Sequence, residues 1–432
     1  MILKSAIRRL VPRSILGWYH FILSFIAAVV YGWPARRLIV VGVTGTKGKS
    51  TTGAMLWHIL QSTGHKTGLI STAQLAIGDK TWLNDLKMTM PGRLTLQKLL
   101  RRMVRAGCTY LVLETSSEGL AQWRHVGIPY QVAVFTNLQP EHLESHGSYE
   151  SYRQAKGRLF AAVAKRHGTA VVNLDDKEAM YFLHYPVARR LGYTSQDKSF
   201  PNLASVLSAT EIKASAKESV FTVNNETVHL PVGGEFNIAN ALATLSAATA
   251  LGIDFKSAVS ALGSFAGTPG RLEFINQGQP FDVVVDYAHT PESLEALYKT
   301  LGPAAAAHSG GLIAVLGSCS GGRDRAKREP LGNLAGSYAK LVIVTDEDPY
   351  DEEPLSIMQT VARGALQAKK QLGQDLFIVP DRRQAIALAI SKAKPGDVVA
   401  ITGKGAEQWL CQARGKKIPW DDRQVVRTEL GI

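Results

Sequence analysis

The stretch Leu38–His58, LIVVGVTGTKGKSTTGAMLWH, decides how the rest of the chain is interpreted. Its first residues, Leu38–Val43, are apolar and mostly β-branched, which predicts a buried strand. A glycine-rich turn, Gly45–Ser50, follows, and the residues after it have the apolar spacing of a helix. This order of strand, turn and helix is the context that a phosphate-binding loop requires.

The turn carries the residue types that bind phosphate. Its glycines let backbone N–H groups close around phosphate oxygens, and the N-terminus of the next helix adds its positive dipole end. Lys49 would reach the β- and γ-phosphates, and the Ser50 hydroxyl would bind Mg²⁺. The strict pattern has a glycine where this chain has Val43, so the motif is a variant with its first glycine at Gly45. The alternative interpretation is a glycine-rich turn without a ligand.

Composition places the chain among globular proteins. It has 432 residues, of which 45% are hydrophobic and 20% charged, enough for two or three domains. The formal net charge of +13 suits anionic partners, but no basic stripe with interleaved aromatic residues is present, so we expect no nucleic-acid partner. The three cysteines are far apart and lack metal-binding spacing, which indicates reduced thiols and a cytoplasmic location.

The N-terminal segment 15–33 carries no formal charge and has arginines on both sides. As a helix it would be about 28 Å long, just enough to span a bilayer core. Polar and glycine residues interrupt it, and aromatic residues lie at its ends, as in interfacial anchors. We expect an apolar helix at the inner face of the cell membrane. The alternatives are a spanning helix and a helix buried against the first domain.

Downstream strands end in polar side chains. Tyr110–Glu114 (YLVLE) predicts a buried strand whose last residue, Glu114, is a candidate Mg²⁺ ligand. Gln131–Thr136 predicts another strand, followed by His142 between two carboxylates, which suits a metal site. Further elements expected before residue 267 are a strand at Gly68–Ala76, a helix at Leu94–Ala106, a helix at Tyr149–Ala162, a strand at Thr169–Asn173, a small β lobe from about Arg190 to Val232, and a helix at Gly234–Leu251.

A second α/β pattern begins after Gly267–Gly270. Five apolar runs alternate with helical segments from Asp282 to Ile401, which predicts a mostly parallel sheet with right-handed crossovers. The fold class is therefore α/β, with a P-loop central ATPase domain that has a parallel sheet and a small β lobe, and a C-terminal Rossmann-like domain. The expected divisions are 1–37 (N-terminal helix), 38–267 (central domain) and 268–432 (C-terminal domain).

From Leu38 onward these motifs together resemble the Mur ligases, the ATP-dependent amino-acid ligases of peptidoglycan precursor synthesis, and most of all the UDP-N-acetylmuramyl-tripeptide synthetase branch. The phosphate loop is similar to the family pattern GT-x-GK-[ST]. Other segments that match family patterns are ETSSEGL (114–120), TNLQPEHLESHG (136–147), YRQAKGRLF (152–160), GEFNIAN (234–240), GRLE (270–273), DYAHTP (286–291), SGGRDRAKR (320–328) and GKGAE (403–407).

The resemblance implies a role for each matching residue. The ATP-binding residues are Gly45, Thr46, Lys47, Gly48, Lys49, Ser50, Thr51, Asn240, Arg271, Asp286 and His289. Metal and catalytic roles fall to Ser50, Lys49, Glu114, His142 and Lys156, the last being the lysine that this family carbamylates. The acceptor, a muramyl-peptide precursor, contacts Thr89, Ser116, Gln122 and Arg124. The free amino acid contacts Arg323, Glu347, Asp348, Pro349, Tyr350, Gly403 and Glu407.

The implied mechanism is phosphorylation of the acceptor carboxylate by ATP, followed by attack of the incoming amine on the acyl phosphate. The C-terminal domain would close over the site to exclude water. We expect a monomeric enzyme.

Three departures from the family pattern change the expectations. Only about 37 residues precede the loop strand, so the usual uridine-binding domain is not expected. The family motif DNPR is Glu347–Tyr350 (EDPY) here, which argues against diaminopimelate, and the acidic residues around it favour a cationic side chain such as lysine. Glu118 and Ala406 also replace family histidines.

Other interpretations remain open from the sequence. One is a poly-γ-glutamate or folylpolyglutamate synthetase-like ligase, against which DYAHTP and the Gln122/Arg124 pair argue. Another is a non-enzymatic, nucleotide-binding membrane scaffold, against which the combination of Lys49, Glu114, His142 and Lys156 argues.

Overall fold

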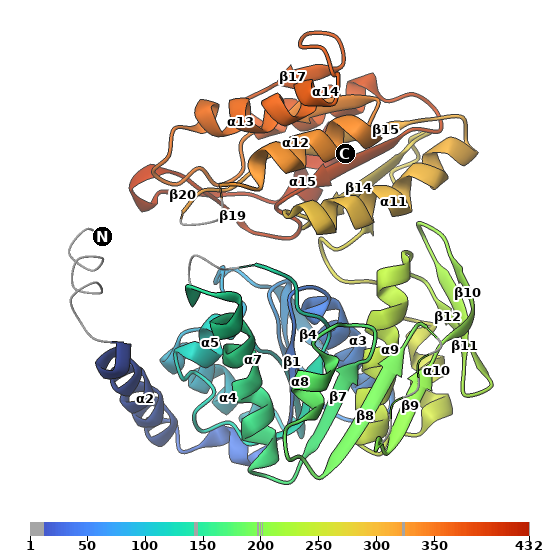
Figure 1. Ribbon diagram of the computed structural model, residues 1–432. Coiled ribbons are helices and arrows are strands. Elements are labelled where there is room, and N and C mark those ends of the chain that lie inside the picture. The colour runs from blue at the N-terminus through green and yellow to red at the C-terminus, as the bar shows by residue number, and fades with distance from the viewer. Residues whose placement is uncertain are drawn as a thin grey trace.

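A computed structural model describes residues 13–141, 146–196, 198, 200, 202–321 and 325–431. Two sheets of mainly parallel strands form the centres of two α/β bodies, which lie one above the other in Figure 1. The chain passes from the first body to the second once, in the segment after α10 (Phe255–Leu262), so each body is built from a continuous stretch of sequence. The fold is therefore α/β, as the sequence predicts.

The first body has a nine-stranded sheet in the order β4-β3-β2-β5-β1-β6-β7-β8-β9. Strand β1 pairs in parallel with β5 and β6, which places the phosphate loop at the centre of the sheet. The strands are β1 (Ile39–Thr44), β2 (Thr67–Ile70), β3 (Gln74–Ile77), β4 (Lys80–Leu83), β5 (Tyr110–Glu114), β6 (Tyr130–Phe135), β7 (Thr169–Asn173), β8 (Arg189–Thr194) and β9 (Ser205–Ser208).

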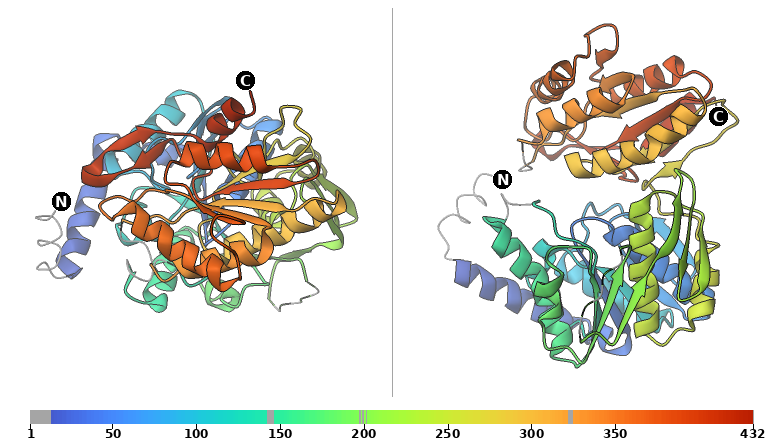
Figure 2. Two further views of the ribbon diagram at one scale, coloured as in Figure 1. Left: turned by 90° about the horizontal axis from the view of Figure 1, so that it is seen from above. Right: turned by 45° about the vertical axis from the view of Figure 1, so that its right-hand side comes forward.

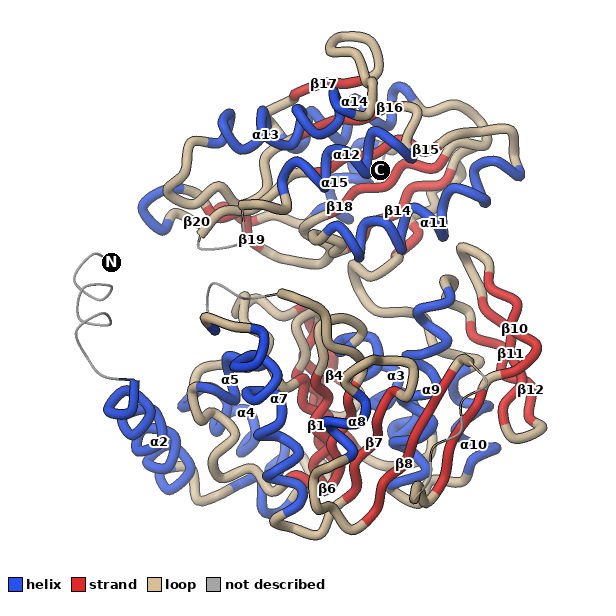
Figure 3. Tube along the Cα trace, in the orientation of Figure 1, coloured by secondary structure: helices blue, strands red, loops and turns tan. Residues whose placement is uncertain are grey.

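Helices cover both faces of this sheet because alternate side chains of each strand point to opposite sides. Val41 and Val43 of β1 pack with α3, α9 and α10, whereas Val40 packs with α4, α7 and α8 on the other face. Figure 3 shows these helices on either side of the strands. Their bounds are α3 (Lys49–Ser62), α4 (Arg93–Arg105), α5 (Ser117–Ala121), α7 (Tyr149–Ala164), α8 (Ala179–Leu183) and α9 (Glu235–Ala250).

Two expectations about the first body were wrong in detail. The apolar run Gly68–Ala76 is not one strand but two antiparallel strands, β2 and β3, because Ser71 turns the chain by exchanging hydrogen bonds with Gln74. The β lobe does not begin near Arg190, since β8 and β9 extend the main sheet in parallel. A separate antiparallel sheet contains only β10 (Thr210–Ala214), β11 (Ser219–Val223) and β12 (Glu226–Leu230).

The second body has a six-stranded sheet in the order β13-β14-β18-β15-β16-β17, parallel except for β13. Helices α11, α12 and α13 pack on one face, and α14 and α15 on the other. The elements are β13 (Glu273–Phe274), β14 (Asp282–Asp286), α11 (Pro291–Ala307), β15 (Leu312–Leu316), α12 (Arg328–Tyr338), β16 (Leu341–Val344), α13 (Pro354–Gln367), β17 (Leu376–Ile378), α14 (Arg382–Lys392), β18 (Val398–Thr402), β19 (Trp409–Cys411), η2 (Ala413–Gly415), β20 (Lys417–Pro419) and α15 (Asp422–Glu429).

The N-terminal helix α2 (Arg13–Val30) lies on the outside of the first body, followed by the short helix η1 (Pro34–Arg37). It packs on α4, and its Ala27 and Ala28 are fully buried there. Both views in Figure 2 show α2 at the edge of the molecule. Across the described ranges, none of the helices combines the length and the apolar character needed to span a bilayer.

Candidate active site

The phosphate loop follows β1 directly, and its shape depends on two glycines. Gly45 has φ 152° and Gly48 has φ 80°, values that side-chain-bearing residues rarely adopt. A Cβ atom on Gly45 would lie 1.9 Å from Thr136 Oγ1, and one on Gly48 would lie 2.2 Å from Asn240 Oδ1. The loop is therefore held tightly between β6 and α9, with the N-terminus of α3 behind it.

Glu114 lies at the carboxyl end of β5, beside the first turn of α3, and is 2% exposed. Its Oε2 accepts hydrogen bonds from Ser50 Oγ at 2.8 Å and from the Thr72 backbone N–H at 2.7 Å. Lys49 Nζ is 3.9 Å from Glu114 Oε1 and donates to the Thr46 carbonyl oxygen at 2.9 Å. Two of the side chains expected to bind Mg²⁺, Ser50 and Glu114, thus touch each other.

These oxygen donors fit Mg²⁺, which binds proteins through one or two carboxylates and completes its shell with water and substrate phosphates. Among the residues that the structure describes, no three His, Cys, Asp or Glu side chains form a cluster that could hold a metal ion without such help. His142, a third expected metal ligand, lies outside the described residues, and Lys156 is the fourth.

Lys156, on α7, points toward the phosphate loop and is 1% exposed. Its Nζ donates to the Gly45 carbonyl oxygen at 2.6 Å and lies 4.5 Å from the centre of the Tyr152 ring. Burial, followed by the nearby charge of Lys49, lowers the pKa of Lys156 well below its ordinary value. The buried position therefore shifts the protonation equilibrium of Lys156 toward the neutral amine.

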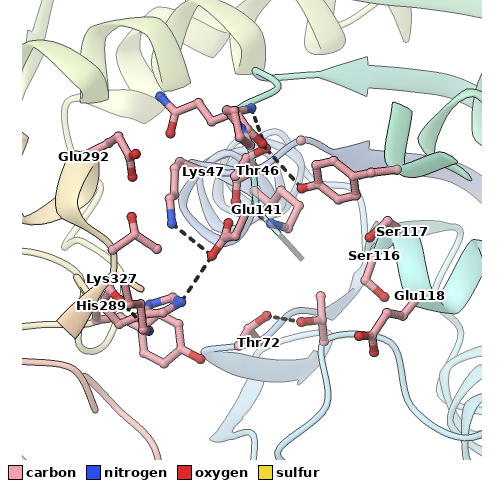
Figure 4. A pocket seen from close by; sticks show the side chains of 18 of the residues that line it. Thr46, Lys47, Thr72, Ser116, Ser117, Glu118, Glu141, His289, Glu292 and Lys327 are labelled. Atoms are coloured by element: carbon pink, nitrogen blue, oxygen red, sulfur yellow. Dashed lines mark hydrogen bonds and ion pairs between the residues drawn. The ribbon is translucent and has the colours of Figure 1, made fainter. Parts of the chain in front are cut away.

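Glu141 links the phosphate loop to the second body. Its Oε1 lies 3.3 Å from Lys47 Nζ and 3.4 Å from His289 Nε2, as Figure 4 shows. His289 follows β14, so this contact crosses the boundary between the two bodies. The loop is also anchored from β6, because Asn137 Oδ1 accepts from the Lys47 backbone N–H at 2.8 Å.

A cleft of about 380 Å³ beside the loop is lined by all the expected nucleotide residues except Gly45. Asn240, on α9, donates to Asn237 Oδ1 at 2.9 Å and accepts from Thr52. Asp286 ends β14 and accepts from the backbone N–H groups of Leu272 and Ala288, both at 2.6 Å. Burial raises the pKa of Asp286. The other expected nucleotide residues lining this cleft are Thr46, Lys47, Gly48, Lys49, Ser50, Thr51, Arg271 and His289.

A second cleft, of about 580 Å³, shares Lys47 and Lys49 with the first, and its lining includes Gly45, Lys156, Thr89, Ser116 and Arg124. Figure 4 shows Thr72 and Ser116 at its wall. Thr89 Oγ1 accepts from Thr72 Oγ1 at 2.8 Å, and Thr72 also binds Glu114. Gln122 Oε1 accepts from Arg124 Nη2 at 2.7 Å. Ser116 caps α5 by accepting from the Gly119 backbone N–H.

Among the described residues expected to bind the free amino acid, Glu407 lines this cleft, whereas Glu347, Asp348, Pro349, Tyr350 and Gly403 line neither cleft. Glu347 is 4% exposed, and a Cβ on Gly403 would lie 2.1 Å from its Oε2. Asp348 and Glu407 both contact Lys404, at 2.9 and 2.7 Å. Pro349 and Tyr350 continue the loop, and the ring of Tyr350 lies against Gly321, where a Cβ would approach it to 2.8 Å. Arg323 lies outside the described residues.

The structure also brings in side chains that sequence reasoning missed. Thr72 joins Glu114 to Thr89, and Lys87 reaches across to Asp348 at 2.5 Å. Glu141 joins the two bodies. Glu141 lies in a quoted motif and could have been weighed as a partner for Lys47, whereas nothing in the local pattern around Lys87 indicates its partner.

A glycine-rich phosphate loop at the carboxyl ends of parallel strands, with a second α/β body closing on it, defines a P-loop nucleotide-dependent enzyme. Two family models match the chain: Mur ligase middle domain over residues 43–248, and Mur ligase, glutamate ligase domain, over residues 270–405. The chain belongs to the Mur ligase family and is an ATP-dependent, ADP-forming amino-acid ligase.

Two curated relatives illustrate the similarity. The UDP-N-acetylmuramyl-tripeptide synthetase of Roseiflexus sp. (strain RS-1) is 40% identical over 425 residues, covering 94% of this chain and 81% of the relative. The UDP-N-acetylmuramoyl-L-alanyl-D-glutamate–2,6-diaminopimelate ligase of Geobacillus kaustophilus (strain HTA426) is 37% identical, with the same coverage of both chains.

Solved structures agree. A UDP-N-acetylmuramoyl-L-alanyl-D-glutamate–2,6-diaminopimelate ligase has a TM-score of 0.61 at 31% identity, covering 91% of this chain and 78% of that one. The Mycobacterium tuberculosis folylpolyglutamate synthase, complexed with ADP and AMPPCP, has a TM-score of 0.64 at 17% identity, covering 87% and 91%. The second likeness shows a shared fold alone.

Proposed function

We propose that this ligase adds a free amino acid to a muramyl-peptide precursor in the cleft between its two bodies. The observation that carries the proposal is a continuous hydrogen-bonded path from the phosphate loop to the acceptor side of the cleft. Ser50 binds Glu114, Glu114 binds Thr72, and Thr72 binds Thr89. A nucleotide on the loop and a carboxylate near Thr89 would therefore share one set of polar groups.

In the proposed reaction, different side chains bind the phosphates, the metal ion and the acceptor. Lys49 and Lys47 neutralise charge on the phosphoryl group while it passes from ATP to the acceptor carboxylate. Ser50, Glu114 and His142 hold Mg²⁺, which supplies further positive charge to the phosphates. The resulting acyl phosphate is attacked by the incoming amine, and phosphate leaves. The second body excludes the water that would hydrolyse the acyl phosphate.

We propose that Lys156 is carbamylated. Only a neutral amine attacks carbon dioxide, and burial beside Lys49 favours this form. The amine nitrogen bonds to the carbon of carbon dioxide and releases one proton to solvent, and the resulting carbamate places a negative charge beside Lys47 and Lys49. Mass measurement of the intact protein tests this, after the carbamate formed in bicarbonate buffer has been rapidly trapped. The wild type should carry one added carbon dioxide, and Lys156→Met should carry none.

The remaining role assignments follow the resemblance. Residues 1–37, 38–267 and 268–432 are proposed as the N-terminal helix, the central domain and the C-terminal domain of a monomeric cytoplasmic enzyme. The side chains proposed for substrate binding are Thr89, Ser116, Gln122, Arg124, Arg323, Glu347, Asp348, Pro349, Tyr350, Gly403 and Glu407.

The test is ADP release by the purified full chain, offered a panel of amino acids together with a muramyl dipeptide in uridine-linked and in lipid-linked form. We expect release that depends on both the amino acid and the acceptor, and a product whose mass is their sum minus water. Release that needs neither would refute the ligase proposal. The two acceptor forms show which carrier the enzyme accepts.

We also propose that residues 15–33 contact the inner face of the cell membrane. One side of α2 packs on the protein, and its other side exposes a continuous apolar stripe at helical spacing. No formally charged residue interrupts the stripe, and exposed Arg36 and Arg37 follow it, as an anionic lipid surface favours. The exposed side chains are Trp18, Tyr19, Ile22, Phe25, Ile26, Val29 and Val30.

Co-sedimentation with vesicles tests this contact. The wild type should pellet with vesicles that contain phosphatidylglycerol, and Ile22→Asp/Phe25→Asp should remain in the supernatant. Leu372→Asp, at an exposed apolar side chain of the second body, is the control and should pellet like the wild type. Vesicle binding that survives the double substitution would refute the proposal. So would light scattering that shows a dimer in the wild type and a monomer in the double variant, because a second copy of the chain would then cover the stripe.

A further inference from the structure

Four charged side chains meet where the second body faces the loop between β4 and α4. The carboxylates belong to Asp348 and Glu407, and the ammonium groups to Lys87 and Lys404. Lys404 is fully buried and lies 2.9 Å from Asp348 Oδ2 and 2.7 Å from Glu407 Oε2. Lys87 lies 2.5 and 3.3 Å from the same two oxygens. Each carboxylate is therefore paired with two cations.

Lys87 reaches this group from the first body. It sits two residues before Thr89, and its backbone φ of 51° lies in the left-handed region that non-glycine residues adopt only at a cost. The same loop is fastened by the Asp85 carbonyl oxygen, which accepts from Trp409 Nε1 at 3.0 Å. The loop thus holds a strained backbone that places one ammonium group between two carboxylates of the other body.

The charges are stable in this arrangement. Although burial opposes it, the carboxylates of Glu407 and Asp348 raise the pKa of Lys87 above its ordinary value. Lys404 and Lys87 in turn outweigh the effect of burial on Asp348 and lower the pKa of its carboxyl. Asp348, one of the acidic side chains that the sequence offered as partners for a cationic substrate, is therefore already paired within the protein, as is Glu407.

We propose that Lys87 is a specificity-determining residue, which fills the position that a substrate's side-chain ammonium group would take between Asp348 and Glu407. The enzyme then uses an amino acid with an uncharged side chain and discriminates against lysine and diamino acids. The inference rests on the proposed function, because it takes these carboxylates as part of the amino-acid site. It replaces the expectation that the acidic residues favour lysine.

The surroundings of the group agree with an uncharged side chain. Tyr350 occupies the position at which the family motif has arginine, so the loop offers no guanidinium to a side-chain carboxylate. The Tyr350 ring lies against Gly321 at the edge of the cleft, and Lys87 and Glu407 line the same cleft. A neutral side chain can enter this space without separating Lys87 from its two carboxylates.

The test compares kcat/KM for glycine, L-alanine and L-serine with kcat/KM for L-lysine, L-ornithine and meso-diaminopimelate, by amino-acid-dependent ADP release. In the wild type, the best neutral amino acid should exceed lysine by about tenfold or more. In Lys87→Ala the ratio should move toward lysine by a similar factor, because the vacated position accepts the substrate ammonium. Lys87→Arg should keep the wild-type preference, and added ethylammonium should restore it in Lys87→Ala.

Lys80→Ala is the matched control, since Lys80 is an exposed lysine on β4 close in sequence to the same loop, and it should leave the ratio unchanged. A wild type that prefers lysine or diaminopimelate overturns the inference even if no variant folds. A Lys87→Ala variant that slows all six amino acids equally also overturns it. No ADP release with any amino acid would instead contradict the proposed function.

Discussion

Replacing Gly48 with alanine should damage ATP binding by an amount that the structure allows us to work out. The added Cβ would lie 2.2 Å from Asn240 Oδ1, and the backbone φ of 80° strains any residue with a side chain. The left-handed conformation costs roughly 1–2 kcal/mol. Displacing Asn240 breaks its hydrogen bonds with Asn237 and Thr52, each worth about 1 kcal/mol.

Without ATP, the variant relieves this overlap by moving the loop. ATP binding has to return the loop to its original conformation. The cost, about 3 kcal/mol in total, therefore appears in the dissociation constant as a weakening of roughly a hundredfold. Titration calorimetry with ATP and Mg²⁺ measures it directly.

A double-mutant cycle separates the clash from the strain. Asn240→Ala removes the side chain that the new Cβ meets, so adding Gly48→Ala to Asn240→Ala should cost only the backbone strain, with a coupling energy of about 2 kcal/mol. Gly64→Ala is the control, because Gly64 has φ 86° but nothing within 4 Å of its added Cβ, and it should not change ATP affinity. A folded Gly48→Ala variant that binds ATP as the wild type does, or a coupling energy near zero, would refute the reasoning.

Three further predictions concern pH, metal and stability. Burial lowers the pKa of His125 to about 4, so between its ordinary value and pH 4 the unfolded chain binds a proton that the folded chain does not. Urea midpoints should therefore fall as pH drops from about 6.5 toward 4, and His125→Phe should flatten this dependence, whereas an unchanged slope would exclude His125 as its source. Ser50→Ala should raise the Mg²⁺ concentration for half-maximal ADP release by about tenfold, and chelation of Mg²⁺ should stop release in both proteins; equal Mg²⁺ curves would remove Ser50 from the metal site. Arg382 and Asp422 form a buried bidentate ion pair at 2.7 and 2.8 Å. Arg382→Met alone should cost about 3–5 kcal/mol of stability, because it leaves the Asp422 charge buried without its partner, and Arg382→Met/Asp422→Leu should cost much less. Thermal melts measure both losses, and equal losses would contradict a charge effect.

The parts of the fold that the sequence predicts are those set by local pattern. The strand at Tyr110–Glu114 has the bounds expected, because an apolar run that ends in a carboxylate marks both the strand and its end. The phosphate loop is likewise fixed by its own glycines. The hairpin of β2 and β3 was missed because its turn, Ser71–Ala73, contains neither glycine nor proline and depends on one serine side chain.

The candidate site likewise contains residues that a local motif predicts and residues that only the tertiary structure brings together. Lys49, Glu114 and Lys156 belong to recognisable motifs, and the structure brings all three to the phosphate loop. Lys87 is different, because its partner Asp348 lies 261 residues away and only the closure of one body on the other brings them together. Such contacts depend on tertiary structure, so the sequence pattern of neither segment indicates them.

The seating of α2 has a consequence for how the enzyme is oriented. Arg93, the first residue of α4, donates to Ser24 on α2 at 3.0 Å and to the Gln122 carbonyl oxygen at 3.4 Å. One guanidinium therefore joins the peripheral helix to the segment after α5 that contains Gln122 and Arg124. Truncating the chain before η1 would free this arginine, so a shortened enzyme should lose acceptor affinity even in a test tube without lipid.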